Sequence, residues 1–271
     1  MPSIWLPGPV LVAGPCVIEN DEVNAEVAEC LTGLAAKLGI RVVFKASFDK
    51  ANRTRAVASR GPGIDRGLEM LQRVREEHEV PVITDVHEVW QVEKAASIVD
   101  ALQIPAFLCR QTDLLKAVGR SRCPVNVKKG QWMSPEGMLG AVEKVRGAEE
   151  VDIALTERGT FFGYGDLVVD MRSFRRMRHD GRVAVLFDAT HSVQQPGQGA
   201  KGGSGGVREH VPELLCAAAA AGADGFYVET HPRPSASPSD SATTWPLDGL
   251  EMLVERALEV WHTARDHKVT T

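Results

Sequence analysis

The sequence predicts an α/β fold, a closed (β/α)8 TIM barrel formed as a single catalytic domain by residues 1–271. Short apolar runs rich in β-branched residues alternate with longer amphipathic runs along the whole chain. Eight such pairs can be counted, the number that closes a parallel barrel inside a ring of helices. A doubly wound open sheet is the competing fold, but the first turn is not glycine-rich. No linker or change of composition divides the chain.

Each predicted strand is a short apolar segment that begins one α/β unit. In chain order the segments are VLVAG (10–14), RVVFKA (41–46), PVITDV (81–86), ALQIPA (101–106), PVNVKK (124–129), DIALTE (152–157), VAVLFDAT (183–190) and GFYVET (225–230). The periodicity between them predicts amphipathic helices, as in EVNAEVAECLTGLAAKL and REHVPELLCAAAAAG. A last helix is expected in LDGLEMLVERALEVWHTARD. One structural plan therefore repeats from the first strand to the end of the chain.

Composition and charge exclude several classes of function. The net charge of -5 argues against a general binder of nucleic acid or of acidic membranes. No apolar stretch has membrane-spanning length and no basic region precedes an apolar N-terminal run, so a cytoplasmic location is expected. The 5 cysteines are scattered without a C-x-x-C pair, which is typical of reduced thiols. An anionic ligand would therefore need a local cluster of cations.

Polar side chains gather at the carboxyl ends of the predicted strands, where the chemistry of such barrels lies. Any one of these residues could be structural, but eight occupied strand ends predict a crowded ionic active site. From the first strand to the last they are Cys16; Lys45; Asp85 and His87; Phe107 and Arg110; Lys128, Lys129 and Gln131; Glu157 and Arg158; Asp188 and His191; Glu229 and His231.

The candidate site residues fall into two chemical groups. The first consists of cations suited to phosphate and carboxylate oxygens: Lys45, Lys50, Arg53, Lys128 and Arg158. The second supplies one thiolate, one imidazole and two carboxylates, a set typical of a divalent transition metal: Cys16, His191, Glu229 and Asp240. No local motif joins the second group, so only a closed barrel would bring it together.

The glycine-rich segment PGQGAKGGSGG, residues 196–206, formally contains a G-x-G-x-x-G pattern. It does not directly join a strand to a helix, so a dinucleotide fingerprint is rejected. We interpret the segment as a mobile loop over the barrel mouth. A flexible surface loop without a role is the alternative.

Several longer blocks of sequence carry a family resemblance. AGPCVIEN, FKASFDKANR, ITDVHE, IPAFLCRQTDLL, NVKKGQW, LTERGTFFGYGDLVVDMRS, DATHSVQQPG and ETHPRPSASPSDSATTWPL together resemble 3-deoxy-D-manno-octulosonate 8-phosphate synthases. The resemblance implies a (β/α)8 barrel, a homotetramer, and condensation of phosphoenolpyruvate with D-arabinose 5-phosphate and water. The implied products are inorganic phosphate and an eight-carbon sugar acid phosphate, a precursor of bacterial lipopolysaccharide.

The resemblance also assigns contacts to phosphoenolpyruvate. It implies that Lys45 and Lys50 face this substrate, with Lys50 near its carboxylate. Lys128 and Arg158 would clamp its phosphate, and Gln131 would lie beside them. The dense cation cluster of FKASFDKANRTR, residues 44–55, is thereby explained as part of an anion site.

A second set of implied contacts serves the sugar phosphate. Asn52 and Arg53 of the KANR signature would receive its phosphate end, and Asp85 would contact it near the aldehyde. The family usually continues this signature with two serines, where this chain has Thr54 and Arg55. Threonine keeps the hydroxyl, whereas the added charge has no assigned role. The remaining implied substrate contacts are Phe107 and Arg110, the latter in a neighbouring subunit's site.

The family has a metal-dependent and a metal-independent branch, which differ at the position of Cys16. The metal-independent branch carries asparagine there. With His191, Glu229 and Asp240 also present, the chain resembles the metal-dependent branch, which implies one divalent ion of Mn, Fe, Co or Zn. The ion could activate water or orient the aldehyde, and Glu229 could be ligand, base or both. Asp85, His191 and Glu229 form the implied catalytic set; for Cys16 alone, a small buried thiol is the alternative.

Three other functions fit parts of this pattern. The related synthase that joins phosphoenolpyruvate to erythrose 4-phosphate in aromatic biosynthesis shares the barrel, but its K-P-R-T signature differs from KANR at residues 50–53. A Schiff-base aldolase would use Lys45 or Lys128 as nucleophile, since neighbouring cations lower the pKa of a lysine. A non-catalytic barrel that binds sugar phosphates would leave the metal-type residues unexplained.

Overall fold

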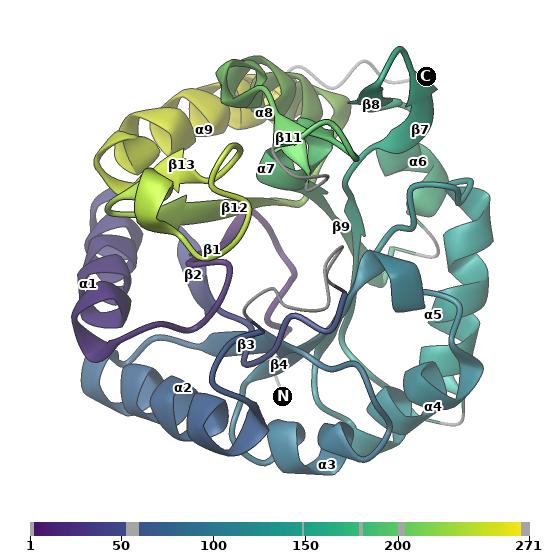
Figure 1. Cartoon of the computed structure of the whole chain (residues 1–271). Coiled ribbons are helices and arrows are strands. Elements are labelled where there is room, and N and C mark those ends of the chain that lie inside the picture. The colour runs from purple at the N-terminus through teal and green to yellow at the C-terminus, as the bar shows by residue number, and fades with distance from the viewer. Residues whose placement is uncertain (1–2, 53–59, 148, 179–180, 200–203, 267–271) are drawn as a thin grey trace.

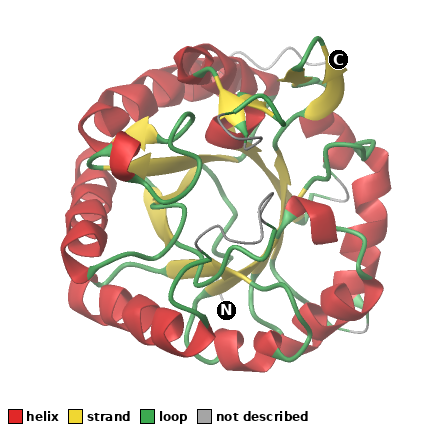
Figure 2. Cartoon of the chain, viewed as in Figure 1, coloured by secondary structure: helices red, strands yellow, loops and turns green. Residues whose placement is uncertain are grey.

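The computed structural model of the chain describes residues 3–52, 60–147, 149–178, 181–199 and 204–266. Eight parallel strands form a closed barrel inside a ring of helices, which confirms the predicted fold (Figure 1). The strands follow one another around the barrel in chain order, and the last pairs with the first from Val10 opposite Gly225 to Gly14 opposite Glu229. Figure 2 shows the same two layers, strands within and helices outside.

The barrel strands overlap all eight predicted segments. They are β1 (Val10–Gly14), β2 (Arg41–Lys45), β3 (Val82–Asp85), β4 (Ala101–Ile104), β5 (Val125–Lys128), β6 (Ile153–Glu157), β9 (Val183–Asp188) and β12 (Gly225–His231). Strand β9 ends two residues before the prediction because the Asp188 side chain caps the next helix, accepting a hydrogen bond from the backbone N–H of His191.

The helices outside the barrel are α1 (Asp21–Leu38), α2 (Ile64–His78), α3 (Gln91–Ala96), α4 (Thr112–Ser121), α5 (Leu139–Arg146), α6 (Ser173–Met177), α8 (Val211–Ala221) and α9 (Leu250–Asp266), whereas the short α7 (Ala189–Ser192) lies inside this ring, directly after β9 (Figure 1). Their apolar faces pack on the outer face of the strands and form one continuous core. Helix α1 begins at an asparagine cap, Asn20, and ends at Gly39 in the left-handed conformation that glycine adopts without strain. None of the helices described is long and apolar enough to cross a membrane.

Short elements above the barrel were not predicted. Strands β7 (Thr160–Gly163) and β8 (Asp166–Val168) form one hairpin, and β13 (Trp245–Pro246) pairs in parallel with the last residues of β12. Strands β10 (Gln194–Gln195) and β11 (Gly205–Gly206) pair at the two ends of the predicted mobile loop. Residues 200–203 of that loop lie outside the described residues, so its mobility stays a prediction.

An apolar plug closes the amino-terminal end of the barrel. Trp5 is fully buried there, and its Nε1 donates to the Asp152 carbonyl at 3.2 Å. Arg41 holds the plug in place by donating to the backbone carbonyls of Ser3 and Ile4 at 2.9 and 3.2 Å. The inward-facing side chains packed with Trp5 include Val10, Val12, Val43, Ile83 and Leu186. Any site in the barrel must therefore open at the other end.

Candidate active site

A cavity of about 550 Å³ opens at the carboxyl ends of the barrel strands. Its wall contains most of the predicted site residues: Lys45, Lys50, Asn52, Asp85, Phe107, Lys128, Gln131, Arg158, His191 and Asp240. Cys16 and Glu229 lie fully buried close to it. The structure thus brings together residues that lie as far apart in the chain as Cys16 and Asp240.

Of the predicted substrate-binding residues that the structure describes, Arg110 alone does not line this cavity. Arg53, Thr54 and Arg55 lie outside the described residues. Arg110 is exposed and does not line the cavity, and its carbonyl accepts a hydrogen bond from Lys144 Nζ at 3.1 Å. Its predicted reach into a neighbouring subunit stays a prediction.

Lys45 is a fixed cation at the end of β2. Its Nζ donates to Ser47 Oγ at 3.0 Å and lies 3.4 Å from Asp85 Oδ2 and 3.5 Å from Glu229 Oε1. Burial opposes the charge, but the two carboxylates outweigh it and raise the pKa of Lys45 above its ordinary value. Lys45 therefore stays charged, and a nucleophilic amine at this position is disfavoured.

Lys128 ends β5 and has a different environment. Its Nζ donates to Asp188 and lies 3.0 Å from the centroid of the Tyr227 ring. Burial lowers the pKa of Lys128 to about 8 although Asp188 opposes the shift. This amine therefore changes its charge close to neutral pH.

Arg158 follows β6 and presents an unused donor to the cavity. Only 6% of the residue is exposed, and Nη2 donates to Gln194 Oε1 at 2.7 Å. Nη1 is buried and has no hydrogen-bond partner within the described part of the chain. An unpaired buried donor costs about 1–3 kcal/mol of stability. Binding of an anion that accepts a hydrogen bond from Nη1 would remove this cost. Gln131, 5% exposed, lines the same cavity.

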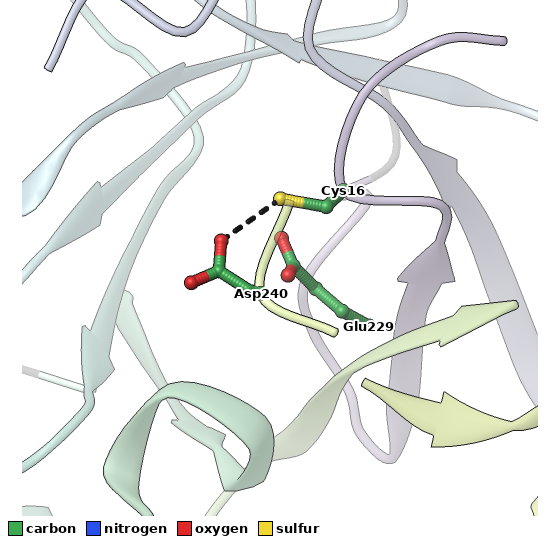
Figure 3. A group of neighbouring side chains, drawn as sticks. All are labelled: Cys16, Glu229 and Asp240. Carbon is green, nitrogen blue, oxygen red and sulfur yellow. Dashed lines mark hydrogen bonds between the residues drawn. The ribbon is translucent and has the colours of Figure 1, made fainter. Parts of the chain in front are cut away.

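Cys16, Glu229 and Asp240 form a compact cluster of potential metal ligands (Figure 3). One donor atom from each lies within 4.8 Å of the others, and Cys16 Sγ donates to Asp240 Oδ2 at 3.2 Å. Burial, together with the charge of Glu229, raises the pKa of the Cys16 thiol well above its ordinary value. Glu229 Oε2 is buried and unpaired among the described residues. A thiol and two carboxylates, one with an unused oxygen, fit a divalent metal ion.

Asp240 is held in a conformation that non-glycine residues rarely adopt, with φ of 51°. Its carbonyl accepts from the backbone N–H groups of Thr243 and Thr244, each at 2.9 Å. Its carboxylate accepts from Gln194 Nε2 and Ser239 Oγ, each at 2.7 Å. The surrounding hydrogen bonds keep a locally strained backbone in place, a feature that concentrates at functional sites.

His191 borders the three-residue cluster without belonging to it. Its Nε2 lies 3.5 Å from Glu229 Oε2, and its Nδ1 lies 2.7 Å from Asp188 Oδ2. Because a carboxylate only accepts, Nδ1 carries a proton toward Asp188, and Nε2 faces the second carboxylate, Glu229. Metal-bound histidines commonly have this carboxylate support. The assignment of His191 as the fourth ligand stays a prediction.

Sequence reasoning assigned no role to three residues that connect the two chemical groups. Asp188 bonds both Lys128 and His191, and Gln194 bonds both Arg158 and Asp240. Tyr227 lies beneath Lys128 on the inner face of β12. Tyr227 precedes Glu229 by two residues, so strand alternation would have placed both on one face. Nothing in the sequence signalled Gln194.

The chain is similar to known proteins over nearly its whole length. The model of the DAHP synthetase I family matches residues 8–265. A 2-dehydro-3-deoxyphosphooctonate aldolase of Stenotrophomonas maltophilia is 49% identical over 257 residues, 95% of this chain and 92% of that protein. Proteins of the same name from Desulfotalea psychrophila and Nitratidesulfovibrio vulgaris are each 51% identical over 251 residues, 93% of this chain and 89% and 91% of those proteins. The similarity therefore spans the barrel and the cavity together.

Proposed function

The chain belongs to the DAHP synthetase I family, and we propose that it condenses phosphoenolpyruvate with D-arabinose 5-phosphate and water. The products are 3-deoxy-D-manno-octulosonate 8-phosphate, a lipopolysaccharide precursor, and inorganic phosphate. The relatives' shared name and their identity of about one half support this reaction. The observation that carries it is a single cavity that joins an anion clamp to a cluster of metal-type donors.

Binding of phosphoenolpyruvate requires cations at both of its ends. We assign its phosphate to Lys128 and Arg158, with Gln131 beside them, because Arg158 Nη1 is a buried and unused donor. We assign its carboxylate to Lys45 and Lys50. Both reactants carry phosphate, so these cations reduce their mutual repulsion and fix their orientation. Orientation of two reactants contributes at most about 7–11 kcal/mol to lowering a barrier.

The sugar phosphate would occupy the outer part of the cavity. Asp85 would accept hydrogen bonds from the sugar near its aldehyde, and Asn52 and Phe107 line the rim. Arg53 and Thr54 remain candidates for the sugar's phosphate from the KANR resemblance alone. We also propose a homotetramer in which Arg110 serves a neighbouring subunit, one catalytic domain per chain, and a cytoplasmic location.

The chemistry forms a carbon–carbon bond and a carbon–oxygen bond from water, breaks the carbon–oxygen bond to phosphate, and leaves a proton on the former aldehyde oxygen. Carbon 3 of phosphoenolpyruvate attacks the aldehyde carbon while water adds to carbon 2. Phosphate then leaves with its bridging oxygen, and Lys128 and Arg158 stabilise the departing dianion. The carboxylate of Glu229 can take a proton from water, and Asp188 orients the imidazole of His191 through Nδ1.

We further propose that the chain belongs to the metal-dependent branch of these synthases. Cys16, Glu229 and Asp240, with His191, would hold one divalent ion of Mn, Fe, Co or Zn. Such an ion would lower the pKa of a bound water or polarise the aldehyde oxygen. The unpaired oxygen of Glu229 and the His191 Nε2 atom 3.5 Å from it support this assignment.

Phosphate release measured with each aldose phosphate tests the proposed reaction. We expect arabinose 5-phosphate to be turned over better than erythrose 4-phosphate, because the exposed amide of Asn52 at the cavity would bond only the longer sugar. Equal turnover of both sugars would instead favour the aromatic-pathway synthase. Trapping with borohydride is the matched control, since labelling of a lysine would indicate a Schiff-base aldolase.

A further inference from the structure

Four buried polar side chains form a continuous hydrogen-bonded row across neighbouring barrel strands. Thr156 Oγ1 on β6 donates to Asn126 Oδ1 on β5 at 2.6 Å. Asn126 Nδ2 donates to Gln103 Oε1 on β4 at 2.9 Å, and Gln103 Nε2 donates to Asp85 Oδ1 on β3 at 2.6 Å. All four residues are at most 5% exposed. We call these residues the polar row.

The direction of every hydrogen bond in the polar row follows from the carboxylate at its end. The cations Lys45 and Lys50 outweigh burial and hold the pKa of Asp85 below its ordinary range, so the carboxylate only accepts. Gln103 must therefore turn its NH2 group to Asp85 and its oxygen to Asn126. Asn126 in turn offers its NH2 group to Gln103 and its oxygen to the Thr156 hydroxyl. A reversed amide would place two acceptors against each other.

Asp85 is held from its other side as well. Ser47 Oγ donates to Asp85 Oδ2, and Lys45 Nζ lies 3.4 Å from the same oxygen. With Gln103 on Oδ1, the plane of the carboxylate is fixed by donors on both oxygens. Asp85 and Gln103 line the cavity, whereas Asn126 and Thr156 are fully buried behind it.

The polar row occupies a layer of the barrel interior, and the layer next to it is apolar. Two positions earlier on the same strands, the inward-facing residues are Ile83, Ala101 and Ala154. Burying amides and a hydroxyl is tolerated only when their hydrogen bonds are satisfied, and such networks then fix one arrangement of side chains. The polar row ends on the Asp85 carboxylate, which lines the cavity, so we infer that the row fixes the orientation of this carboxylate.

We propose that Asn126 and Thr156 are positioning residues for the sugar phosphate. They act through Gln103 and fix the orientation in which Asp85 accepts hydrogen bonds from the sugar. The proposal rests on the proposed function, in which Asp85 contacts the aldose. Neither residue touches phosphoenolpyruvate, so its binding should not depend on them.

The first test removes only the hydroxyl at the start of the polar row. Thr156→Val should raise the KM for arabinose 5-phosphate about 3- to 10-fold, the usual effect of one lost buried hydrogen bond, and leave the KM for phosphoenolpyruvate within about twofold. Thr156→Ser, which restores the hydroxyl, should return the sugar KM to the wild-type value. The matched control is Thr84→Val on β3, because the Thr84 hydroxyl is buried and unpaired among the described residues. It should change neither KM.

The second test reverses the polar row. In Asn126→Asp the new carboxylate attracts the NH2 group of Gln103, which turns the Gln103 oxygen toward Asp85. We expect kcat/KM for arabinose 5-phosphate to fall about 10²-fold, with calorimetric affinity for phosphoenolpyruvate retained. If this variant does not fold, Thr156→Val and Thr156→Ser still decide the matter.

The outcomes separate this inference from the proposed function. Wild-type protein that neither binds nor condenses the two substrates would refute the proposed function. Wild-type protein that is active, with variants that affect both substrates equally or show no rescue by serine, would refute the polar row as a positioning device. Selective loss of sugar binding with rescue supports it.

Discussion

The two ends of the barrel use the same strands for opposite purposes. On β2, β3 and β9, inward positions two residues apart change from apolar to charged: Val43 to Lys45, Ile83 to Asp85, and Leu186 to Asp188. The apolar member of each pair packs around Trp5, whereas the charged member lines the cavity. Since strand side chains alternate with a period of two, one short strand supplies both an apolar side chain to the plug and a charged side chain to the cavity. Stability should therefore depend on one end and activity on the other.

Metal removal should have the largest effect, and only at the catalytic end. A strong chelator should abolish phosphate release, and Mn²⁺, Co²⁺, Fe²⁺ or Zn²⁺ should restore part of it, because Cys16, Glu229 and Asp240 would lose their shared ion. Metal content is measured alongside activity. Full activity of metal-stripped protein would refute the assignment.

The variant Cys16→Asn separates a ligand from a packing residue at the same position. If Cys16 binds the ion, metal occupancy measured by elemental analysis should fall. A thiol that only fills space would instead lower the free energy of unfolding and leave metal content unchanged.

Truncation of the plug should lower stability and leave activity nearly unchanged. Trp5→Ala should lower the free energy of unfolding by about 3–5 kcal/mol, because the cavity left in the interior is not refilled. Urea titration measures this loss, and kcat/KM of the remaining folded protein should stay within about twofold. A large loss of kcat/KM at full folding would show that the two ends are not independent.

Removal of one phosphate donor should slow turnover far more than it changes stability. Arg158→Ala should lower kcat about 10²–10³-fold, the usual loss when one charge-stabilising donor is removed. Because the variant also removes Nη2 and leaves the buried oxygen of Gln194 without its donor, the free energy of unfolding should fall by about 1–3 kcal/mol, partly offset by removal of the unpaired Nη1. The exposed Arg172 provides the matched control, and Arg172→Ala should affect neither quantity.

Arg158→Ala also tests which bond of phosphoenolpyruvate breaks, the carbon–oxygen or the phosphorus–oxygen bond. With ¹⁸O in the bridging position of phosphoenolpyruvate, wild type and Arg158→Ala should both release labelled phosphate. Label retained in the sugar acid would mean that the phosphorus–oxygen bond breaks, contrary to the proposed mechanism.

The last predicted effect is a pH dependence caused by Lys128. Loss of its proton should weaken binding of phosphoenolpyruvate and raise the free energy of unfolding. The pKa of Lys128 is lowered from 10.5 to about 8, so the folded protein releases this proton at lower pH than the unfolded chain. From about pH 8 to 10.5 this group should raise the free energy of unfolding, while the KM for phosphoenolpyruvate rises up to about tenfold per pH unit. Lys128→Arg should flatten the KM profile, since arginine stays charged. A lysine profile that is flat to pH 9.5 would contradict the assignment.

Much of this comparison could be predicted because strand ends are local features. The alternation of apolar runs predicted all eight strands, and polar residues at their ends predicted most of the cavity wall. The Trp5 plug could not be predicted, because its segment has no periodicity and depends on Asp152 and Arg41 far along the chain. The roles of Asp188 and Gln194 likewise depend on partners from several strands, which no spacing in the sequence encodes.

The separation of Cys16 and Asp240 by 224 residues has a consequence for folding. The donors come from the first and last strands of the barrel or the loops after them, so they meet only when β1 pairs with β12 and closes the ring. Contacts between such distant parts of a chain form slowly, because a large loop must close first. An ion held by these donors would bind the native state alone and stabilise it by mass action. The cluster is therefore a chemical marker of ring closure, and capture of the ion during refolding should coincide with the final folding step.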